Sequence, residues 1–334
     1  MKNNKGDLSP FFIMWKIGNV EIKSKVVLAP MAGITSLAYR NFMKKFGVGL
    51  TVTEMVSDCG LIYGNDKTIE YLKTTEDERP VAIQLFGGNA ENICKAIDVV
   101  LKENSNVDFI DINLGCPVPK VTKTGAGAAL LKEPKKLYEF MKKICNYSPV
   151  PVTAKIRLGW DEKSINFMEN IAALEKAGVK AIGLHTRTAK QGYSGKANYE
   201  IIRDLQAKMS VPLIISGDIY TLENALQFLN ISKATAVMIA RGGVGHPRLV
   251  EQINHYFETG EKLPDATLEE NIAYLLEFAD MLIEEKSEYK AMMLLRGIAT
   301  KFFDGYPNTK KIKNALAQTL TTRDSLVRIL SEYR

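Results

Sequence analysis

Short apolar runs rich in β-branched residues recur along the first 240 residues, and segments with helical periodicity lie between them. Eight such runs are present, at Val26–Met31, Leu50–Met55, Val81–Phe86, Phe109–Leu114, Val152–Leu158, Ala181–His185, Pro212–Ser216 and Ala236–Ala240. The helical segments include Asn89–Glu103, Pro134–Asn146, Ile165–Ala177, Tyr199–Met209 and Leu222–Leu229. This alternation indicates βαβ units and a parallel sheet. Eight units within about 250 residues predict an α/β fold of the (β/α)8, or TIM, barrel type.

Polar residues at the ends of the runs favour this barrel over its alternative, a doubly wound open sheet. They are Pro30-Met-Ala-Gly33, Glu54, Gln84, Asn113 with Cys116, Lys155 with Arg157, His185 with Arg187, Ser216-Gly-Asp218 and Arg241-Gly-Gly243. In a barrel all eight strand ends open on one face, whereas in an open sheet most would lie too far apart to meet one ligand. Periodicity alone does not show closure, so the open sheet stays as the alternative.

The last third of the chain has a different pattern. A helix is expected at Pro247–Thr259, followed by a linker around Gly260–Ala266 with turn residues and little periodicity. Helical periodicity then returns over Leu268–Phe303, Lys310–Leu320 and Arg323–Tyr333, with a break near Asp304–Pro307. Such segments predict a small helical bundle. We therefore expect a barrel domain over residues 1–260 and a helical domain over residues 261–334.

The composition is that of an ordinary globular protein. Of the 334 residues, 46% are hydrophobic and 25% are charged, so a large core is available. No apolar run reaches the roughly 18 residues of a membrane span, and Phe11–Trp15 is too short for the core of a signal peptide. We therefore expect a cytoplasmic protein that does not enter a membrane, with a monomer as the default state.

The four cysteines and three histidines form no metal-binding pattern. Cys59, Cys94, Cys116 and Cys145 are far apart in the sequence and include no C-x-x-C pair. A structural zinc site is therefore not expected, and reduced cytosolic thiols fit this distribution best.

Charge is distributed unevenly near the C-terminus. Residues 264–289 have a net charge of −7, and residues 290–334 have a net charge of +6, equal to that of the whole chain. A basic solvent-exposed surface and a binding site for a polyanion both explain this segregation. Charge counts alone leave the two explanations open.

The most specific motif lies at the end of the fourth apolar run. The run stops at Asn113-Leu-Gly-Cys-Pro117, where Gly and Pro break the strand. Cys116 is thereby placed at a strand end, and the proline after it keeps its backbone extended. Gly125 and Gly127 allow tight turns before the next helix. We expect a ligand to lie opposite this thiol.

Two glycine-containing loops after the last two runs are candidates for a phosphate site. They are Ser216-Gly-Asp218 and Ala240-Arg-Gly-Gly243, and the backbone N–H groups of the corresponding barrel loops commonly bind phosphate. Arg241 can add a charge-assisted hydrogen bond, although glycine-rich turns also occur in barrels without such a ligand. Gln84 matches the donors and acceptors on the pyrimidine edge of a flavin, and Lys155 can stabilise the negative charge of a reduced flavin.

With these motifs in view, the sequence resembles the tRNA-dihydrouridine synthases, and within that family it is most similar to the bacterial B-type enzymes. The matching segments are Ala29–Gly33, Gln84–Gly87, Asp111–Pro117, Lys120 with Gly125–Leu131, Lys155–Arg157, His185–Arg187, Gly217–Ile219, Ala240–Gly242 and Leu295–Arg296. The resemblance spans nearly the whole chain, and the order Asn-x-Gly-Cys-Pro is highly specific.

This resemblance implies a barrel that binds FMN and a helical domain that helps to hold tRNA. The residues expected to contact FMN are Pro30, Met31, Ala32, Gln84, Lys155, His185, Ser216, Gly217, Asp218, Ala240 and Arg241, and Arg296 is expected to contact tRNA. The chain departs from the family pattern at two places. Ser216 stands where Asn is usual, and Gly297 follows Arg296 where Lys is frequent.

The resemblance also implies the reduction of uridine to 5,6-dihydrouridine, which needs a hydride at C6 and a proton at C5. Cys116 is the expected proton donor, because an ordinary thiol is mostly protonated at neutral pH. Asn113, Arg157 and Arg187 are candidates for binding the uracil carbonyls. An alternative has Cys116 adding to the ring as a thiolate nucleophile. NADPH or NADH is the expected reductant, and no Rossmann fingerprint indicates which.

Two other functions would use the same residues differently. One is an FMN-dependent oxidoreductase acting on a free pyrimidine, as dihydroorotate-type enzymes do, but such a substrate does not need a basic C-terminal segment. The other is a tRNA-binding protein with a vestigial flavin site. The presence of Gln84, Cys116, Lys155 and His185 argues against the second function, so the synthase is the principal prediction.

Overall fold

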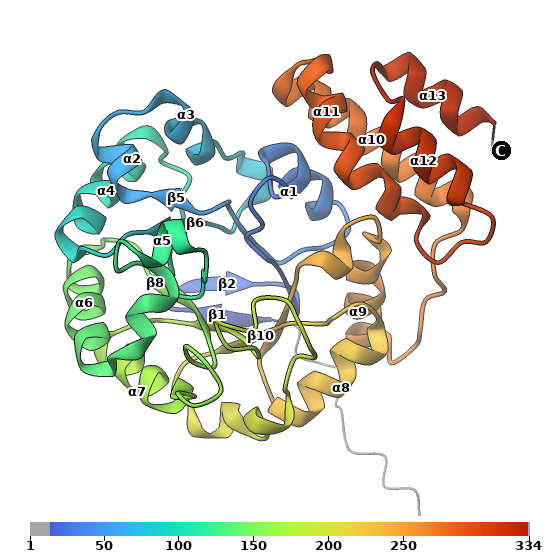
Figure 1. The fold of residues 1–334 in the computed structure, drawn as a ribbon. Helices are drawn as coiled ribbons and strands as arrows, with labels where there is room; N and C mark the ends of the chain where they lie inside the picture. Colours follow the sequence, from blue (N-terminus) through green and yellow to red (C-terminus); the bar gives the residue numbers. More distant parts are fainter. Residues whose placement is uncertain (1–13, 333–334) are drawn as a thin grey trace, which may run out of the picture.

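The computed structural model describes residues 14–332, and at its centre eight parallel strands form a closed barrel (Figure 1). In the order of their pairing they are β3 (Val26–Leu28), β4 (Leu50–Val52), β6 (Val81–Phe86), β7 (Phe109–Asn113), β8 (Val152–Arg157), β9 (Ile182–His185), β10 (Leu213–Ser216) and β11 (Ala236–Ile239). The pairing of β4 with β6 and of β11 with β3 closes the ring. The predicted TIM barrel is confirmed, and the open-sheet alternative is wrong.

Helices cover the outside of the barrel. They are α1 (Leu37–Lys44), α2 (Asp58–Ile62), α3 (Asp66–Ile69), α4 (Ala90–Glu103), α6 (Pro134–Tyr147), α7 (Phe167–Ala177), α8 (Leu222–Ser232) and α9 (Arg248–Thr259). The short α5 (Pro119–Thr122) lies instead in the loop after β7, inside this ring of helices in Figure 1. The start of α4 and the end of α7 follow the expected capping rules. Asn89 accepts from two N–H groups at the start of α4, and Gly178, with a φ of 101°, ends α7.

The helix predicted over Tyr199–Met209 is wrong. Two short 3-10 turns, η4 (Glu200–Ile202) and η5 (Leu205–Lys208), take its place. Asp204 between them has a φ of 53°, in the left-handed region, and this conformation ends one turn before the other begins. The apolar positions Ile202 and Leu205 are nevertheless buried, as the periodicity required.

A β-hairpin closes the amino-terminal end of the barrel. It consists of β1 (Trp15–Ile17) and β2 (Val20–Ile22), which pair antiparallel and lie across the centre of the ring in Figure 1. Ile17 and Ile22 are fully buried and pack with barrel-interior residues such as Val27 and Phe109. The hairpin therefore leaves the opposite, carboxyl-terminal end of the barrel as the place where a ligand can enter.

The C-terminal region is helical, as predicted. It contains α10 (Leu268–Lys286), α11 (Glu288–Ile298), η7 (Ala299–Phe303), α12 (Lys310–Gln318) and α13 (Arg323–Ser331), and it lies beside α1 in Figure 1. The periodic segment Leu268–Phe303 is not one helix, because Ser287 has a φ of 98° and separates α10 from α11.

An aromatic contact joins this region to the barrel. The ring of Phe278, in α10, lies 5.5 Å from that of Tyr39 and 5.3 Å from that of Phe42, both in α1. One continuous cluster of buried side chains extends through both parts. The division at residues 260 and 261 stays a prediction, and its outer ends, including Phe11–Ile13 and Tyr333, lie outside the described residues.

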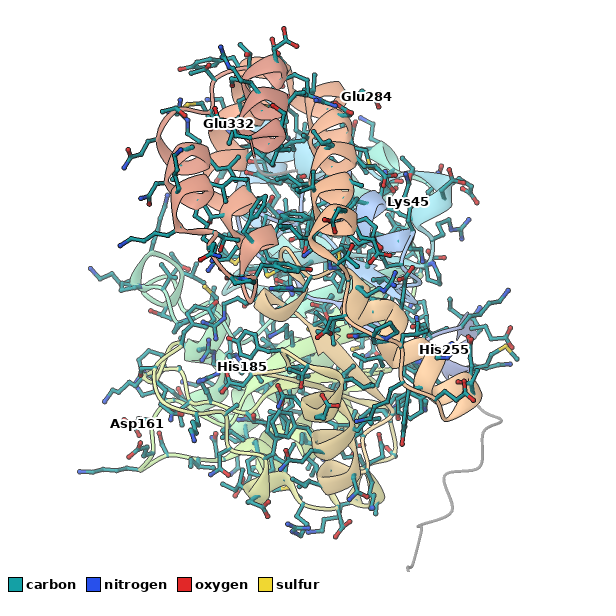
Figure 2. The ribbon with its side chains drawn as sticks, turned by 90° about the vertical axis from the view of Figure 1, so that its right-hand side faces the viewer. Lys45, Asp161, His185, His255, Glu284 and Glu332 are labelled. Atoms are coloured by element: carbon teal, nitrogen blue, oxygen red, sulfur yellow. The ribbon has the colours of Figure 1, made fainter. Side chains whose placement is uncertain are left out.

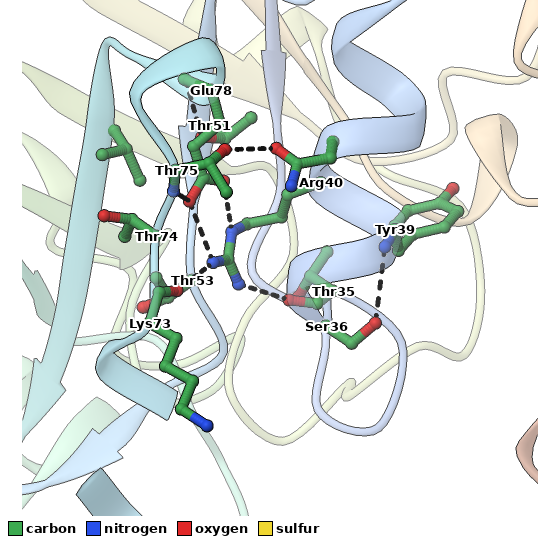
Figure 3. Close-up of polar contacts among 12 residues, drawn as sticks. Thr35, Ser36, Tyr39, Arg40, Thr51, Thr53, Lys73, Thr74, Thr75 and Glu78 are labelled. Carbon is green, nitrogen blue, oxygen red and sulfur yellow. Dashed lines mark hydrogen bonds and ion pairs between the residues drawn. The ribbon is translucent and has the colours of Figure 1, made fainter. Parts of the chain in front are cut away.

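A buried ion pair connects α1 to the segment before β6 (Figure 3). The guanidinium of Arg40 donates to both carboxylate oxygens of Glu78, at 2.8 Å from Nε and 3.2 Å from Nη2, and both side chains are almost fully buried. Arg40 also donates to the carbonyl oxygens of Thr35 (3.0 Å) and Lys73 (2.7 Å). Because Thr35 Oγ1 accepts from Met31 N at 2.8 Å, the ion pair fixes a loop that carries predicted ligand contacts.

Candidate active site

Cys116 lies in the loop that follows β7, and the backbone on both sides of it is fixed. Asn113 Oδ1 accepts from Cys116 N at 2.9 Å and from Gly115 N at 3.2 Å. The carbonyl of Cys116 accepts from Ala128 N at 3.0 Å. Gly127 has a φ of 58°, and a Cβ there would lie 2.7 Å from the Cys116 carbonyl oxygen. The half-buried thiol is therefore presented at the mouth of the barrel by a loop that tolerates little change.

A chain of buried polar side chains supports Asn113 from below. Asn113 Nδ2 donates to Gln84 Oε1, and Gln84 Nε2 donates to Asp111 Oδ2, both at 2.7 Å. Asp111 also accepts from Thr153 Oγ1 at 2.6 Å. Burial raises the pKa of Asp111, although these hydrogen bonds oppose the shift. Gln84 is fully buried, and its amide bonds mainly to the protein.

Asp111 was missed in the sequence because it lies inside a strand rather than at its end. Residues two apart on a strand face the same side, so the spacing of Asp111 and Asn113 places both in the barrel interior. Two polar side chains on the inner face of an otherwise apolar strand are the signal that could have identified the chain of hydrogen bonds.

Lys155 lies in β8, two residues before its end, and His185 ends the neighbouring strand β9. Burial, followed by the positive charge of Arg157, lowers the pKa of Lys155 to about 8. Among residues 14–332 no carboxylate pairs with its ammonium group. Burial and the surrounding cations lower the pKa of His185 to about 2, so its imidazole is neutral at physiological pH. Figure 2 shows His185 on the opposite side of the barrel from His255, which has no predicted role.

Arg157 and Arg187 are buried, and both bind backbone carbonyls of the loops above the strands. Arg157 donates from Nε to Gly115 O at 2.8 Å and from Nη1 to Gly192 O at 2.7 Å and Thr188 O at 2.9 Å. Arg187 donates to Ser194 O and Gly195 O, and its Nη2 binds both carboxylate oxygens of Asp218, at 2.9 and 2.8 Å. Much of each guanidinium thus holds the protein's own loops.

The two loops predicted to bind phosphate lie side by side after β10 and β11. Gly217 has a φ of 118°, and a Cβ there would lie 2.9 Å from His185 Cδ2, so only glycine fits between the loop and the imidazole. Ser216 is buried at the end of β10. The side chain of Arg241, next to Ala240, remains 46% exposed and lies 3.7 Å from Asp218, whose charge Arg187 already balances.

The β3–α1 loop completes the rim of the mouth. Pro30 and Met31 are half-buried and Ala32 is exposed. Gly33 N donates to the buried carboxylate of Glu54 at 2.6 Å, and burial raises the pKa of that group. The hydrogen bonds of Met31 N and Gly33 N thus anchor this loop above the barrel.

All but one of the predicted site residues gather at the carboxyl-terminal end of the barrel. The exception is Arg296, in α11, where Nε donates to Leu320 O at 2.7 Å and ties α11 to the loop between α12 and α13. Within residues 14–332 no group of three or more His, Cys, Asp or Glu side chains could hold a metal ion. In the same residues no helix is long and apolar enough to cross a membrane.

Fold and candidate site together define a TIM-barrel protein with a thiol, an unpaired ammonium and a neutral imidazole at the carboxyl ends of its strands. The chain belongs to the dihydrouridine synthase family, whose model matches residues 27–332. A probable tRNA-dihydrouridine synthase of Rickettsia bellii is 31% identical over 318 residues, which cover 94% of this chain and 97% of that protein. The tRNA-dihydrouridine synthase B of Vibrio vulnificus is 33% identical over 84% of this chain and 87% of its own.

Solved structures with a similar fold include an old yellow enzyme homologue from Zymomonas mobilis and histamine dehydrogenase from Rhizobium sp. 4-9. The first has a TM-score of 0.53 and 11% identity, and it covers 77% of this chain and 95% of its own. The second has a TM-score of 0.58 and 12% identity, and it covers 82% of this chain and 51% of its own. At these identities the likeness concerns the barrel fold alone.

Replacing Lys155 by Met should stabilise the protein free of ligand. Because its pKa is about 8 in the folded chain against an ordinary value of 10.5, the unfolded chain binds more protons between these two pH values. The cost of burying the charge is therefore fully present below pH 8 and is relieved as the pH rises to 10.5. We expect Lys155→Met to add about 2 kcal/mol of unfolding free energy at pH 7, and less at pH 10, in urea titrations.

Lys155→Arg is the matched control, because it keeps a buried positive charge at every pH tested. A Lys155→Met protein that is less stable than the wild type at pH 7 would contradict the argument. So would a gain in stability that is the same at both pH values.

Proposed function

We propose that this protein reduces uridines of tRNA to 5,6-dihydrouridine, with FMN as cofactor and NADPH or NADH as reductant. The family match over residues 27–332 carries this proposal. The site supports it, because a thiol, an unpaired ammonium and a neutral imidazole share one end of the barrel. The runner-up, reduction of a free pyrimidine, would use the same residues but would leave the basic C-terminal segment without a role.

The residues at the mouth fit an anionic, phosphorylated ligand. An ammonium that is half-buried without a carboxylate partner is costly, and a flavin with a negative charge on its pyrimidine edge would compensate Lys155. The groups that would hold FMN are Pro30, Met31, Ala32, Gln84, Lys155, His185, Ser216, Gly217, Asp218, Ala240 and Arg241. When bound and reduced, FMN supplies the hydride that uracil C6 must receive.

Cys116 would donate the proton that uracil C5 must receive. The hydrogen bonds from Cys116 N and Gly115 N to Asn113 Oδ1 hold the thiol in place without using the sulfur. Asn113 thus acts chiefly by positioning the loop. Among the described residues no acceptor binds Arg157 Nη2, so its N–H groups remain available to a uracil oxygen, the role proposed for Arg157. The same role is proposed for Arg187 through Nη1, which lies 3.4 Å from His185 Nε2, because its Nε and Nη2 are engaged by Ser194, Gly195 and Asp218.

The basic residues of the C-terminal region would bind the tRNA backbone. Lys310 and Lys311 are exposed and lie in the first turn of α12. Positive charges at a helix N-terminus oppose the helix dipole, so these lysines do not serve the stability of α12. Attraction to phosphate groups explains them better. Arg296, which is half-buried beside Leu320, is proposed to contribute to the same surface.

Reversing the charge of this lysine pair should weaken tRNA binding without harming the fold. For Lys310→Glu/Lys311→Glu we expect a higher Kd for tRNA at low salt, and a salt dependence whose slope falls by about 1 for each phosphate group that is no longer bound. The unfolding free energy should be unchanged or slightly higher, because Glu favours the first turn of a helix. Filter binding or fluorescence anisotropy across a salt series measures both the Kd and its salt dependence.

Lys208→Glu/Lys233→Glu is the matched control. These exposed lysines precede β10 and β11 at the amino-terminal end of the barrel, and the change in net charge is the same. Equal losses of tRNA affinity in the two variants would mean that net charge alone matters, and the proposed surface would then be wrong.

The function itself is tested by the purified protein and by tRNA from cells. We expect a yellow protein that releases FMN on denaturation, is bleached by NADPH under anaerobic conditions, and forms dihydrouridine in tRNA lacking the modification. Mapping dihydrouridines in tRNA from a strain without the gene identifies the position reduced. A yellow protein that reduces free uracil or orotate but leaves tRNA unchanged would support the runner-up instead.

A further inference from the structure

Tyr193 is an exposed aromatic residue at the mouth of the barrel that no sequence motif singles out. It lies in the loop between β9 and η4, and 65% of the residue's surface is exposed. Its ring centroid lies 6.3 Å from that of His185 and 4.9 Å from the guanidinium carbon of Arg241. An exposed ring that borders two predicted cofactor contacts is positioned to meet whatever enters the site.

The backbone on both sides of Tyr193 is fixed by buried arginines. The preceding carbonyl, of Gly192, accepts from Arg157 Nη1 at 2.7 Å. The following carbonyl, of Ser194, accepts from Arg187 Nε at 3.1 Å. Both arginines are less than 4% exposed, so the loop is anchored to the ends of β8 and β9. The exposed ring is thus held on a rigid support, which lowers the entropy cost of stacking on a ligand.

The same arginine also links Tyr193 to the thiol. Arg157 donates from Nε to the carbonyl of Gly115, the residue before Cys116, at 2.8 Å. One buried guanidinium therefore sets the position of the Cys116 loop and of the Tyr193 loop relative to each other. The loop of the aromatic ring and the loop of the proposed proton donor are thus anchored to the same side chain.

We propose that Tyr193 is a substrate-binding residue whose ring stacks on a nucleobase of the RNA as the target uridine enters the barrel mouth. This inference rests on the proposed function. A uridine must leave its stack to reach the thiol, and an aromatic side chain replaces the stacking that the RNA loses. The neighbouring guanidinium of Arg241 adds positive charge beside the ring.

The test compares Tyr193→Ala with Tyr193→Phe, which keeps the ring and removes only the hydroxyl. We expect Tyr193→Ala to lower kcat/KM for tRNA roughly 5- to 150-fold, the range expected for the loss of one base stack. Tyr193→Phe should stay within about twofold of the wild type. FMN content, thermal stability and the rate of flavin reduction by NADPH should be unchanged in both variants. Tyr147→Ala, an exposed tyrosine at the end of α6, controls for the loss of a surface ring.

Four outcomes would overturn the inference. They are wild-type activity in Tyr193→Ala, an equal loss in Tyr193→Phe, a loss traced to flavin content, and a slower reduction by NADPH, which would assign the ring to the nicotinamide. If the wild-type protein itself forms no dihydrouridine, both the proposed function and this inference are wrong. If the wild type is active and only the comparison of variants fails, the proposed function stands.

Discussion

Cys116→Ala should retain FMN and its reduction by NADPH, yet form dihydrouridine about 10²- to 10⁴-fold more slowly than the wild type. That range is the usual contribution of a positioned general acid. The substitution removes only the sulfur, because the loop is held by Asn113 through the N–H groups of Gly115 and Cys116, which alanine keeps. Anaerobic stopped-flow measurements separate the two half-reactions. We expect normal flavin reduction and slow flavin reoxidation by tRNA.

Cys59→Ala is the matched control, since Cys59 is an exposed free thiol in α2. If Cys116→Ala forms dihydrouridine at the wild-type rate, Cys116 is not the proton donor. A covalent RNA–protein adduct that forms and decays at the rate of product formation would instead assign Cys116 as a nucleophile. Cys116→Ser keeps a weaker acid whose hydroxyl can still reach a bound base, whereas Cys116→Ala removes the acid. The rates of the two variants therefore separate weakened proton donation from its loss.

The strands were predictable because their signal is local. Val81–Phe86 was predicted with the bounds that β6 has, and the other barrel strands differ by a few residues at their ends. Burial on both faces of a parallel strand requires a continuous apolar run, and such runs are visible in the sequence. The clustering of the site followed from the barrel, because the carboxyl ends of all its strands lie on one face.

The interactions of the loops were not predictable in the same way. Arg157 and Arg187 were expected to bind substrate, but the structure shows them donating to carbonyls of loops up to 42 residues away. Every residue has a backbone carbonyl, so no sequence motif indicates which one will accept a hydrogen bond from an arginine. The breaks at Asp204 and Ser287 were missed for a related reason. Both residues adopt a positive φ that apolar periodicity does not report.

The sequence also did not predict where the C-terminal region packs on the barrel. Its helices were predicted from periodicity, but periodicity identifies an apolar face without its partner. The structure places Phe278 of α10 against Tyr39 and Phe42 of α1. Glu285, near the end of α10, accepts from Ala38 N at 2.7 Å, in the first turn of α1. Helix α10 thus contacts the helix that follows the β3–α1 loop of the site, and α11, which carries Arg296, packs on α10.

Breaking the Arg40–Glu78 pair should have the largest effect on stability. We expect Glu78→Gln, and separately Arg40→Met, to lower the unfolding free energy by about 3–5 kcal/mol, since each leaves an uncompensated buried charge or unpaired carbonyls. Such a loss is a large part of the total stability of a typical protein. FMN affinity should fall as well, because Arg40 holds Thr35, and Thr35 holds the amide of Met31.

A double-mutant cycle separates the ion pair from its surroundings. Once one partner is absent, removing the second no longer strands a charge, so the double variant Arg40→Met/Glu78→Gln should lose less than the sum of the single losses. The exposed pair of Arg203 and Glu200 provides the control, where Arg203→Ala should cost at most about 1 kcal/mol. Additive losses for Arg40 and Glu78 would show that the two side chains stabilise the fold independently. Unchanged FMN affinity in a folded single variant would show that the loop at Met31 does not depend on the pair.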